Sequence, residues 1–333
     1  MKKKGLLILS LILLTAGCAQ RDRYVAISGY AQGGTYTVKV NLAGVRERPE
    51  AIKASVDSIL RAVDFSVSGY NSESLLSRFN AGEAIVPDAI FADLYNISRR
   101  LYDETGGALN VAAGPLFDIW GFGFTTDSLP STDHIREALA LCDMSALPDS
   151  IRAGEAIDGR GLHRPGSGLS VSGQGVRLNF NAIAQGYSCD LVAAYLRGIG
   201  IRDMLVDIGE IFLEGRNPSG QGWAIGVDKP IDGNNTPGAQ IDSVIRSDGG
   251  AHGIVTSGNY RKFYIRDGRK YAHTIDPRTG YPVQHQLLSA TVIAPTATLA
   301  DAYATYCMVI GPEAARSFIG SRPDLDAYLI CGD

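Results

Sequence analysis

The succession of apolar patterns along the chain constrains its fold more than any other feature. Residues 34–42 alternate apolar and polar side chains, as a half-buried strand does, whereas 48–64 and 88–105 place apolar residues at helical spacing. The same patterns predict further helices at 181–196, 299–310 and 312–319, and strands at 204–209, 223–230, 251–256, 260–265 and 288–294. These elements lack a strict βαβ rhythm. We therefore predict a mixed α/β (α+β) fold in which mixed or antiparallel sheets are flanked by helices.

Two Gly-rich polar stretches separate these elements. We expect hairpins and loops over 148–178 and a surface loop over 231–250. Glycine is in excess along the whole chain, with 39 of 333 residues against a usual share of roughly 7 %. Because glycine adopts conformations closed to other residues, this excess predicts tight turns and places where the backbone approaches a ligand closely.

Charge and hydrophobic content exclude several classes of protein. Hydrophobic residues make up 45 % of the chain and charged residues 20 %, which is typical of globular proteins rather than of disordered or polytopic membrane chains. The net charge is −4, whereas phosphate backbones call for clustered Lys and Arg. Nucleic acid is therefore not an expected partner.

The beginning of the chain has the layout of an export signal. Three lysines precede an apolar run over 6–14, which is too short to span about 30 Å of hydrocarbon. The run leads to Thr-Ala-Gly-Cys, which resembles a bacterial lipobox ending at Cys18. We predict a signal peptide over 1–17, a lipidated tether over 18–28 and one domain over 29–333. The protein is then expected in the bacterial cell envelope, lipid-anchored and facing the periplasm; an ordinary cleaved signal is the alternative.

The segment AHTIDPRTG (272–280) places a histidine and a carboxylate on one short turn. Pro277 fixes φ in this turn, and Gly280 can supply the positive φ that ends it. His273 and Asp276 are therefore a candidate general-base pair. The alternative is structural, with Asp276 capping the turn through backbone N–H groups while His273 packs.

The segment TLADAYATYCMVIG (298–311) is a candidate cation site. Asp301 and Thr305 are four residues apart on a predicted helix, so their oxygens lie on one face. Mg²⁺ prefers such hard oxygen ligands, and a phosphate-bearing ligand would have to complete the set. The alternative is an Asp that stabilises the helix N-terminus and a Thr that bonds back to the preceding turn.

Three other segments leave two interpretations open. In 177–190, Gly186 near a helix start suits either a phosphate contact or close packing. In 105–123, the aromatic run at Trp120 suits either a flat ligand or the core. In 254–264, a Thr-Ser-Gly sequence suits either an anion contact or a turn. A GxSxG sequence and an HExxH sequence are absent from the chain, which argues against a serine hydrolase of that type and a zinc site of that type.

Taken in order, the segments resemble the ApbE family, the FAD:protein FMN transferases. The matching stretches are GYAQGGTY (29–36), SGYNSESLLSRFN (68–80), 105–123, 178–190, SGNYRKFY, HTIDPRTGYP and ADAYAT. The resemblance covers nearly all of the chain after the signal. It implies an ApbE-like fold with the FAD site between its sub-domains.

The resemblance also implies an activity. The enzyme would use Mg²⁺ to transfer FMN from FAD to a Ser or Thr hydroxyl of a target flavoprotein, releasing AMP. Acceptors in the family are subunits of membrane electron-transfer complexes and related periplasmic proteins. The resemblance implies a metal site formed by the Ala182 carbonyl, Asp301 and Thr305. The implied flavin or nucleotide contacts are Gln32, Tyr70, Ala108, Leu109, Asn110, Asn179, Gln185 and Ile275. His273 and Asp276 are the candidates for the base that deprotonates the acceptor.

Several of these positions depart from the usual family residues. Gln32 stands in place of Met, Asn110 and Asn179 in place of Asp, Gln185 in place of Lys or Glu, and GEI (209–211) in place of GGD. The departures bear on ligand affinity and on the balance between transfer and hydrolysis. A periplasmic FAD pyrophosphatase that yields FMN and AMP is thus the alternative enzyme, and a non-catalytic flavin-binding lipoprotein is the alternative without turnover.

Overall fold

The computed structural model describes residues 22–121, 129–154, 157–158, 176–234, 236–260, 263–266 and 268–332. The predicted signal peptide and Cys18 lie outside these residues. So do most of the loops predicted over 148–178 and the last two residues of the aromatic segment, 122–123. Within the described part of the chain, none of the helices is long and apolar enough to cross a membrane.

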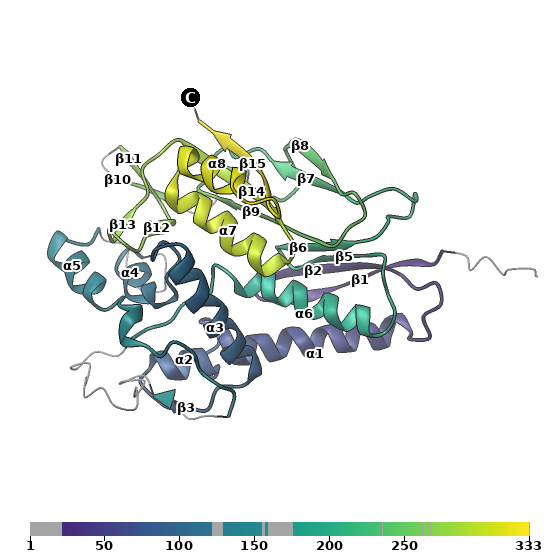
Figure 1. Ribbon diagram of the computed structural model, residues 1–333, viewed down its shortest axis with the longest axis horizontal. Coiled ribbons are helices and arrows are strands. Elements are labelled where there is room, and N and C mark those ends of the chain that lie inside the picture. The colour runs from purple at the N-terminus through teal and green to yellow at the C-terminus, as the bar shows by residue number, and fades with distance from the viewer. Residues whose placement is uncertain are drawn as a thin grey trace, which may run out of the picture.

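A seven-stranded sheet forms the centre of the molecule (Figure 1). Its strand order is β1-β2-β5-β6-β9-β14-β15, and every neighbouring pair is antiparallel. The strands are β1 (Tyr24–Ala31), β2 (Gly34–Asn41), β5 (Met204–Asp207), β6 (Ile211–Glu214), β9 (His252–Gly258), β14 (Leu287–Ala294) and β15 (Asp326–Cys331). Helices flank this sheet, so the predicted fold class is confirmed.

The helices follow the apolar periodicity of the sequence. They are α1 (Pro49–Val67), α2 (Leu75–Asn80), α3 (Ala89–Glu104), α4 (Gly114–Ile119), α5 (Thr132–Ala140), α6 (Ala184–Gly198), α7 (Ala297–Ile310) and α8 (Pro312–Gly320), with short 3-10 turns η1 (Val111–Ala113) and η2 (Met144–Ala146). In α1 the buried residues recur every three or four positions, from Ile52 through Val56 and Leu60 to Val63. Each of the five helices predicted from the sequence is present.

The two faces of the sheet are covered differently. Val206 and Phe212 pack with α1 and α6, whereas Leu205 and Leu213, one position away, pack with Trp223 on the opposite face. This follows from the two-residue period of a strand. The opposite face carries the hairpin β7 (Ala224–Asp228) and β8 (Ile241–Arg246). The helices α1, α6 and α7 therefore share one layer, and a hairpin forms the other.

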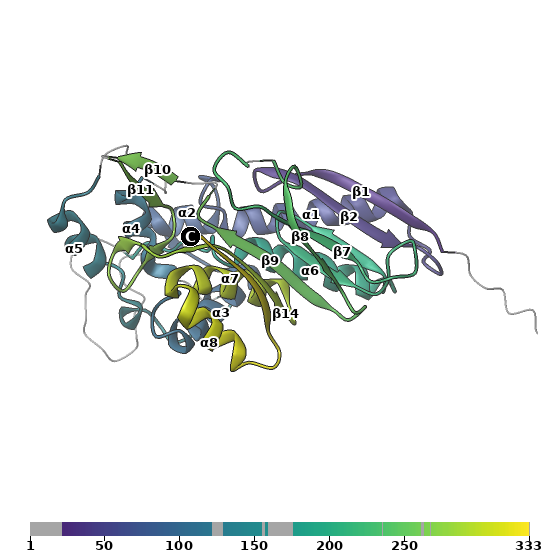
Figure 2. The same cartoon turned by 90° about the horizontal axis from the view of Figure 1, so that it is seen from above.

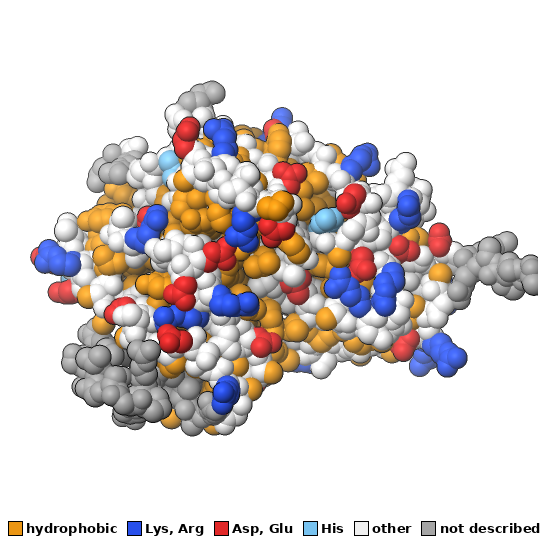
Figure 3. Space-filling model, in the orientation of Figure 1, with side chains coloured by type: hydrophobic (Ala, Val, Ile, Leu, Met, Phe, Trp, Pro, Cys, Tyr) orange, Lys and Arg blue, Asp and Glu red, His pale blue; other side chains and the backbone are white. Residues whose placement is uncertain are grey.

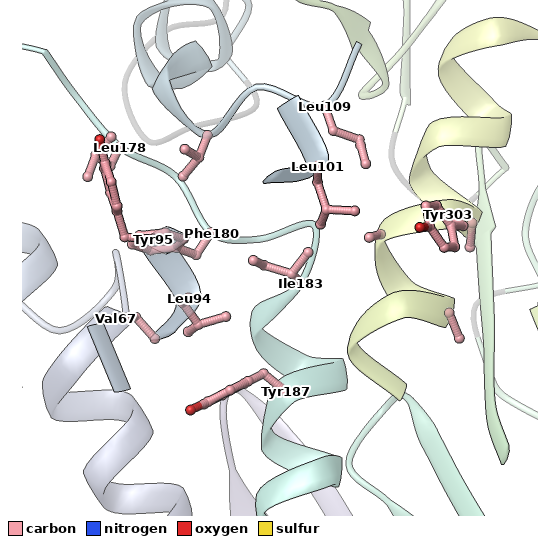
Figure 4. Close-up of a cluster of buried hydrophobic side chains, with 14 of the residues drawn as sticks. Val67, Leu94, Tyr95, Leu101, Leu109, Leu178, Phe180, Ile183, Tyr187 and Tyr303 are labelled. Carbon is pink, nitrogen blue, oxygen red and sulfur yellow. The ribbon is translucent and has the colours of Figure 1, made fainter. Parts of the chain in front are cut away.

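A helical region joins this layer on the side away from β1 (Figure 2). It contains α2 to α5 and three short pairs of strands. The pairs are β3 (Ala84–Ile85) with β4 (Ile157–Asp158), β10 (Phe263–Arg266) with β11 (Arg269–Ala272), and β12 (Ile275–Asp276) with β13 (Tyr281–Pro282). Figure 4 shows where the region meets the sheet helices: Leu94 and Tyr95 of α3 face Ile183 and Phe180, which lie just before α6. One apolar cluster thus holds α1, α3, α6 and α7 together.

Two strands differ from the sequence predictions. β1 begins at Tyr24 and pairs with β2 from that residue, so the sheet includes residues of the segment predicted as a tether (18–28). β8 lies within the predicted surface loop 231–250. Its residues are exposed or half-exposed throughout, so the alternating apolar signal is weak.

On the face drawn in Figure 3, acidic and basic side chains are interspersed rather than clustered by sign.

Candidate active site

Helices α6 and α7 pack against each other (Figure 1). Of the predicted metal ligands, Asp301 and Thr305 lie on α7, and Ala182 lies just before α6. The start of α7 is fixed by Thr296, whose side chain accepts a hydrogen bond from the Leu299 N–H at 3.2 Å. Asp301 lies just over one turn into the helix and is 4 % exposed. Thr305 follows one turn later on the same face. α7 therefore buries a carboxylate and carries a hydroxyl beside it.

Asp301 is a buried acid beside the first turn of α6. Its Oδ2 accepts a hydrogen bond from the Gly186 N–H at 3.0 Å. The pKa of Asp301 is raised to about 7, mainly by burial; the negative charge of Asp190 acts in the same direction, and the Gly186 hydrogen bond opposes both. A carboxylate in this position is costly to ionise unless a cation balances its charge.

Gly186 is a close-packing point between the two helices. A Cβ at this position would lie 2.3 Å from the Ala297 carbonyl oxygen and 2.9 Å from the Asp301 Cβ, so no larger residue fits without displacing α7. Gly186 lies in the first turn of α6, which begins at Ala184, and the N–H groups of a first turn have no acceptor within their own helix. Asp301 supplies that acceptor from α7, and Ala182 lies two residues before α6 begins.

The predicted donor set fits a hard divalent cation. It combines a backbone carbonyl at Ala182, a carboxylate at Asp301 and a hydroxyl at Thr305, which are oxygen ligands of the kind Mg²⁺ takes. Among the residues that the structure describes, no three His, Cys, Asp or Glu side chains gather to hold a metal ion. A cation bound by this set would therefore draw further oxygens from its ligand or from water.

Strand β9 adds a second hydroxyl to this group. The Ser257 Oγ lies 3.4 Å from the Thr305 Oγ1. Val255 packs in the same apolar cluster as α7, and Ser257 shares its face because strand residues two apart point the same way. The Thr-Ser-Gly sequence is therefore the end of a strand beside α7, which excludes the turn, one of the two interpretations that the sequence left open.

The 273–280 loop uses its carboxylate for its own turn. Arg278 donates to Asp276 from its backbone N–H and from its Nε, both at 2.9 Å, and from an Nη at 2.8 Å. The Gly280 N–H donates to the Asp276 carbonyl at 2.8 Å, and Gly280 has a φ of +81°. Asp276 is thus a turn-capping residue held in an ion pair. His273 is half-buried just after β11.

Trp120 belongs to the core rather than to a ligand wall. Its side chain is 4 % exposed, its Nε1 donates to the Gly280 carbonyl at 2.8 Å, and its ring stacks on Tyr271 with centroids 5.9 Å apart. Ile275, a predicted flavin contact, is 3 % exposed in the same apolar cluster. These contacts anchor the 273–280 loop on α4 and α5.

Gln32 lies at the tip of the β1–β2 hairpin. Gln32 and Gly33 form the turn and both have positive φ, +53° and +80°, as a tight hairpin of this hand requires. The Gln32 Nε2 donates to the Ser188 Oγ of α6 at 2.6 Å. The Oε1 is buried and has no hydrogen-bond partner in the described structure. The hairpin tip is thus fixed beside α6, with an acceptor left for a ligand donor.

Asn110 and Asn179, two of the predicted flavin contacts, lie on neighbouring segments. The Asn179 N–H donates to the Val111 carbonyl at 2.7 Å, which brings the segment before α6 alongside η1. Asn110 caps η1 by accepting from the Ala112 N–H and donates to the Cys142 carbonyl, at 2.8 and 2.7 Å. Asn179 accepts from the Asn181 N–H at 2.9 Å. Both amides stabilise local turns.

The remaining predicted contacts differ in accessibility. Ala108 and Leu109 are 2 % and 7 % exposed, so they would meet a ligand mainly through their backbone. Gln185, in the first turn of α6, donates to the Ile208 carbonyl at 3.3 Å. Tyr70 follows α1 and is 71 % exposed. The structure therefore gathers Gln32 and Gln185 with the metal candidates at the start of α6, and leaves Tyr70 on the surface.

Sequence reasoning did not single out two residues that hold the site. Arg278 binds Asp276, and Asp190 binds the start of α7. For Asp190 a signal was present, because it follows Gly186 by four residues and thus lies on the same helix face.

Comparison with known proteins decides the family. The ApbE family model matches residues 33–329. The chain belongs to the ApbE family. It is 31 % identical to the FAD:protein FMN transferase of Haemophilus influenzae, over 99 % of this chain and 93 % of that protein. It is 33 % identical to the Vibrio cholerae protein of the same name, over 93 % and 89 %. The apo flavinyl transferase ApbE of Pseudomonas stutzeri has a similar structure, with a TM-score of 0.78 and 32 % identity over 94 % of this chain and 92 % of that chain.

Proposed function

We propose that the protein transfers FMN from FAD to a Ser or Thr hydroxyl of a target flavoprotein and releases AMP. The relatives named above support flavin transfer. The observation that carries the proposal is the buried Asp301 on α7, which accepts a hydrogen bond from Gly186 in the first turn of α6, two residues after the start of the helix that follows Ala182. The acceptor would be a subunit of a membrane electron-transfer complex or a related periplasmic protein.

Ala182, Asp301 and Thr305 would hold Mg²⁺. When bound, the ion would neutralise charge on the two phosphates of FAD as the bond between them breaks. Asp301 supplies the anionic ligand, and the Gly186 hydrogen bond orients its carboxylate. The Ser257 hydroxyl, 3.4 Å from Thr305, restricts the orientation of the Thr305 side chain.

The transfer needs a base for the acceptor hydroxyl. The acceptor oxygen forms a bond to the FMN-side phosphorus, the P–O bond to AMP breaks, and the hydroxyl proton passes to the base. Asp276 is held by three hydrogen bonds from Arg278, so a proton on this carboxylate would disrupt an ion pair. We therefore assign the base to His273, with Asp276 positioning the loop.

The experiment that tests this function uses the full chain, FAD, Mg²⁺ and an acceptor flavoprotein domain. We expect the acceptor to gain the mass of one FMN while one AMP is released for each acceptor modified. An acceptor whose target hydroxyl is removed by Ser→Ala or Thr→Ala serves as the control and should stay unmodified. AMP and free FMN with an unmodified acceptor would instead identify an FAD pyrophosphatase, and unchanged bound FAD would identify a flavin carrier.

We also propose that Cys18 is lipidated and holds the domain at the periplasmic side of the cell envelope. The proposal rests on the lipobox-like sequence that ends at Cys18. β1 begins at Tyr24, so the chain between the anchor and the sheet is short. Labelled palmitate should enter the wild-type protein, and Cys18→Ser should prevent labelling and release the protein from the membrane fraction. Wild-type protein without label would contradict the assignment.

A further inference from the structure

Asp190 binds the N-terminus of α7 from the neighbouring helix. Its Oδ1 accepts from the Ala297 N–H at 2.9 Å. Its Oδ2 accepts from the Thr298 N–H at 2.9 Å and from the Thr298 Oγ1 at 2.5 Å. A carboxylate at this place satisfies N–H groups that have no partner within their own helix, and it interacts favourably with the positive end of the helix.

This contact and the Gly186–Asp301 hydrogen bond form a pair of cross-links. Gly186 and Asp190 are one turn apart on α6, and Ala297 and Asp301 are one turn apart on α7. Gly186 binds Asp301, and Asp190 binds Ala297, so the two helices meet in an antiparallel register. Because an added Cβ at residue 186 would strike the Ala297 carbonyl, the helices are close together as well as aligned.

We propose that Asp190 is a positioning residue, which sets the register of α7 against α6 and so holds Asp301 and Thr305 in place beside the start of α6, where Gly186 binds Asp301. This inference rests on the cation site proposed above. A shift of α7 along α6 would move Asp301 and Thr305 together relative to the start of α6 and to Ala182, the candidate ligand just before it. Asp190 thereby acts on the site through α7, without contact with the ion.

The test measures binding of Mn²⁺ to the full chain, since Mn²⁺ takes the same oxygen ligands as Mg²⁺ and its free form is quantified by electron paramagnetic resonance. Asp190→Asn keeps the size of the side chain but cannot accept at both oxygens. We expect it to weaken Mn²⁺ binding about 10–100-fold, the range seen when residues behind metal ligands are replaced.

Two further variants separate positioning from general destabilisation and from charge. Thr296→Ala removes the N-cap of the same helix and leaves Asp190 in place, so it should lower the melting temperature without weakening Mn²⁺ binding. Thr298→Val removes one hydrogen bond to Asp190 and keeps its charge, so it should weaken Mn²⁺ binding by a smaller factor than Asp190→Asn.

The outcomes distinguish this inference from the proposed function. Wild-type affinity in Asp190→Asn would overturn the inference. A loss in Thr296→Ala equal to that in Asp190→Asn would also overturn it, because the effect would then follow helix stability. Wild-type affinity in Thr298→Val alongside a loss in Asp190→Asn would assign the effect to charge and overturn positioning. Absence of Mn²⁺ binding by the wild-type chain would overturn the cation site itself.

Discussion

Asp301→Asn is expected to lower Mg²⁺-dependent FMN transfer at least about 100-fold, the upper end of the effect of replacing residues that only support metal ligands. Asn can still accept the hydrogen bond from the Gly186 N–H, so the packing of α6 on α7 should persist while the anionic ligand is lost. The measurement is the initial rate of acceptor modification as a function of Mg²⁺ concentration. Wild-type rates in this variant would remove Asp301 from the metal site.

Asp301→Asn should not destabilise the metal-free protein, although it lowers the rate of transfer. Burial raises the pKa of Asp301 from its ordinary value of 3.8 to about 7, so the folded state favours the protonated acid. The stability that follows from this is fully present below about pH 4 and is lost as the pH rises towards 7. At pH 8 without metal, Asp301→Asn should therefore melt no lower than wild type. Added Mg²⁺ should raise the melting temperature of wild type alone.

His273→Ala is expected to reduce the turnover rate for transfer by about 10²–10⁴, the usual contribution of a general base. The binding of FAD should change much less, because the proposed role concerns the acceptor proton. The pH dependence of the rate should also lose its acid limb. An unchanged rate constant and an unchanged pH profile would exclude His273 as the base.

Asp276→Asn is the matched comparison on the same loop. Because Arg278 already occupies the Asp276 carboxylate, we expect this variant to keep the acid limb of the pH profile and to lose activity mainly through a less ordered turn. A pH profile that loses its acid limb in Asp276→Asn but not in His273→Ala would reverse the two assignments. The comparison thus decides between the candidates that the sequence left open.

Elements with a strong apolar period were predictable, and exposed elements were not. α1, α3, α6, α7 and β14 pack apolar residues on a core, so their spacing is visible in the sequence. β8 is exposed or half-exposed over its length and was expected to be a loop. β1 extends back to Tyr24 because it pairs with β2 over its full length, and the partner of a strand is not encoded in its own pattern.

The candidate site was likewise predictable only in part. Residue type and spacing on one helix predicted Asp301 with Thr305, since an interval of four residues fixes a shared face. The environment of each group came from other segments: Gly186 and Asp190 of α6 for Asp301, and Arg278 for Asp276. Gln32 was predicted as a flavin contact only from its place in the family resemblance. Its hydrogen bond to Ser188 joins residues far apart in the chain.

By itself, the sequence indicated the family and the main helices and strands, and it supplied candidates for binding a cation and moving a proton, because these depend on local spacing and residue type. The tertiary structure alone decided that Asp276 is held in an ion pair, that Gly186 is a packing point, and that Asp190 holds the start of α7. The physical reason is that hydrogen-bond partners and burial depend on which segments meet, and α6 meets α7 across more than a hundred residues of chain.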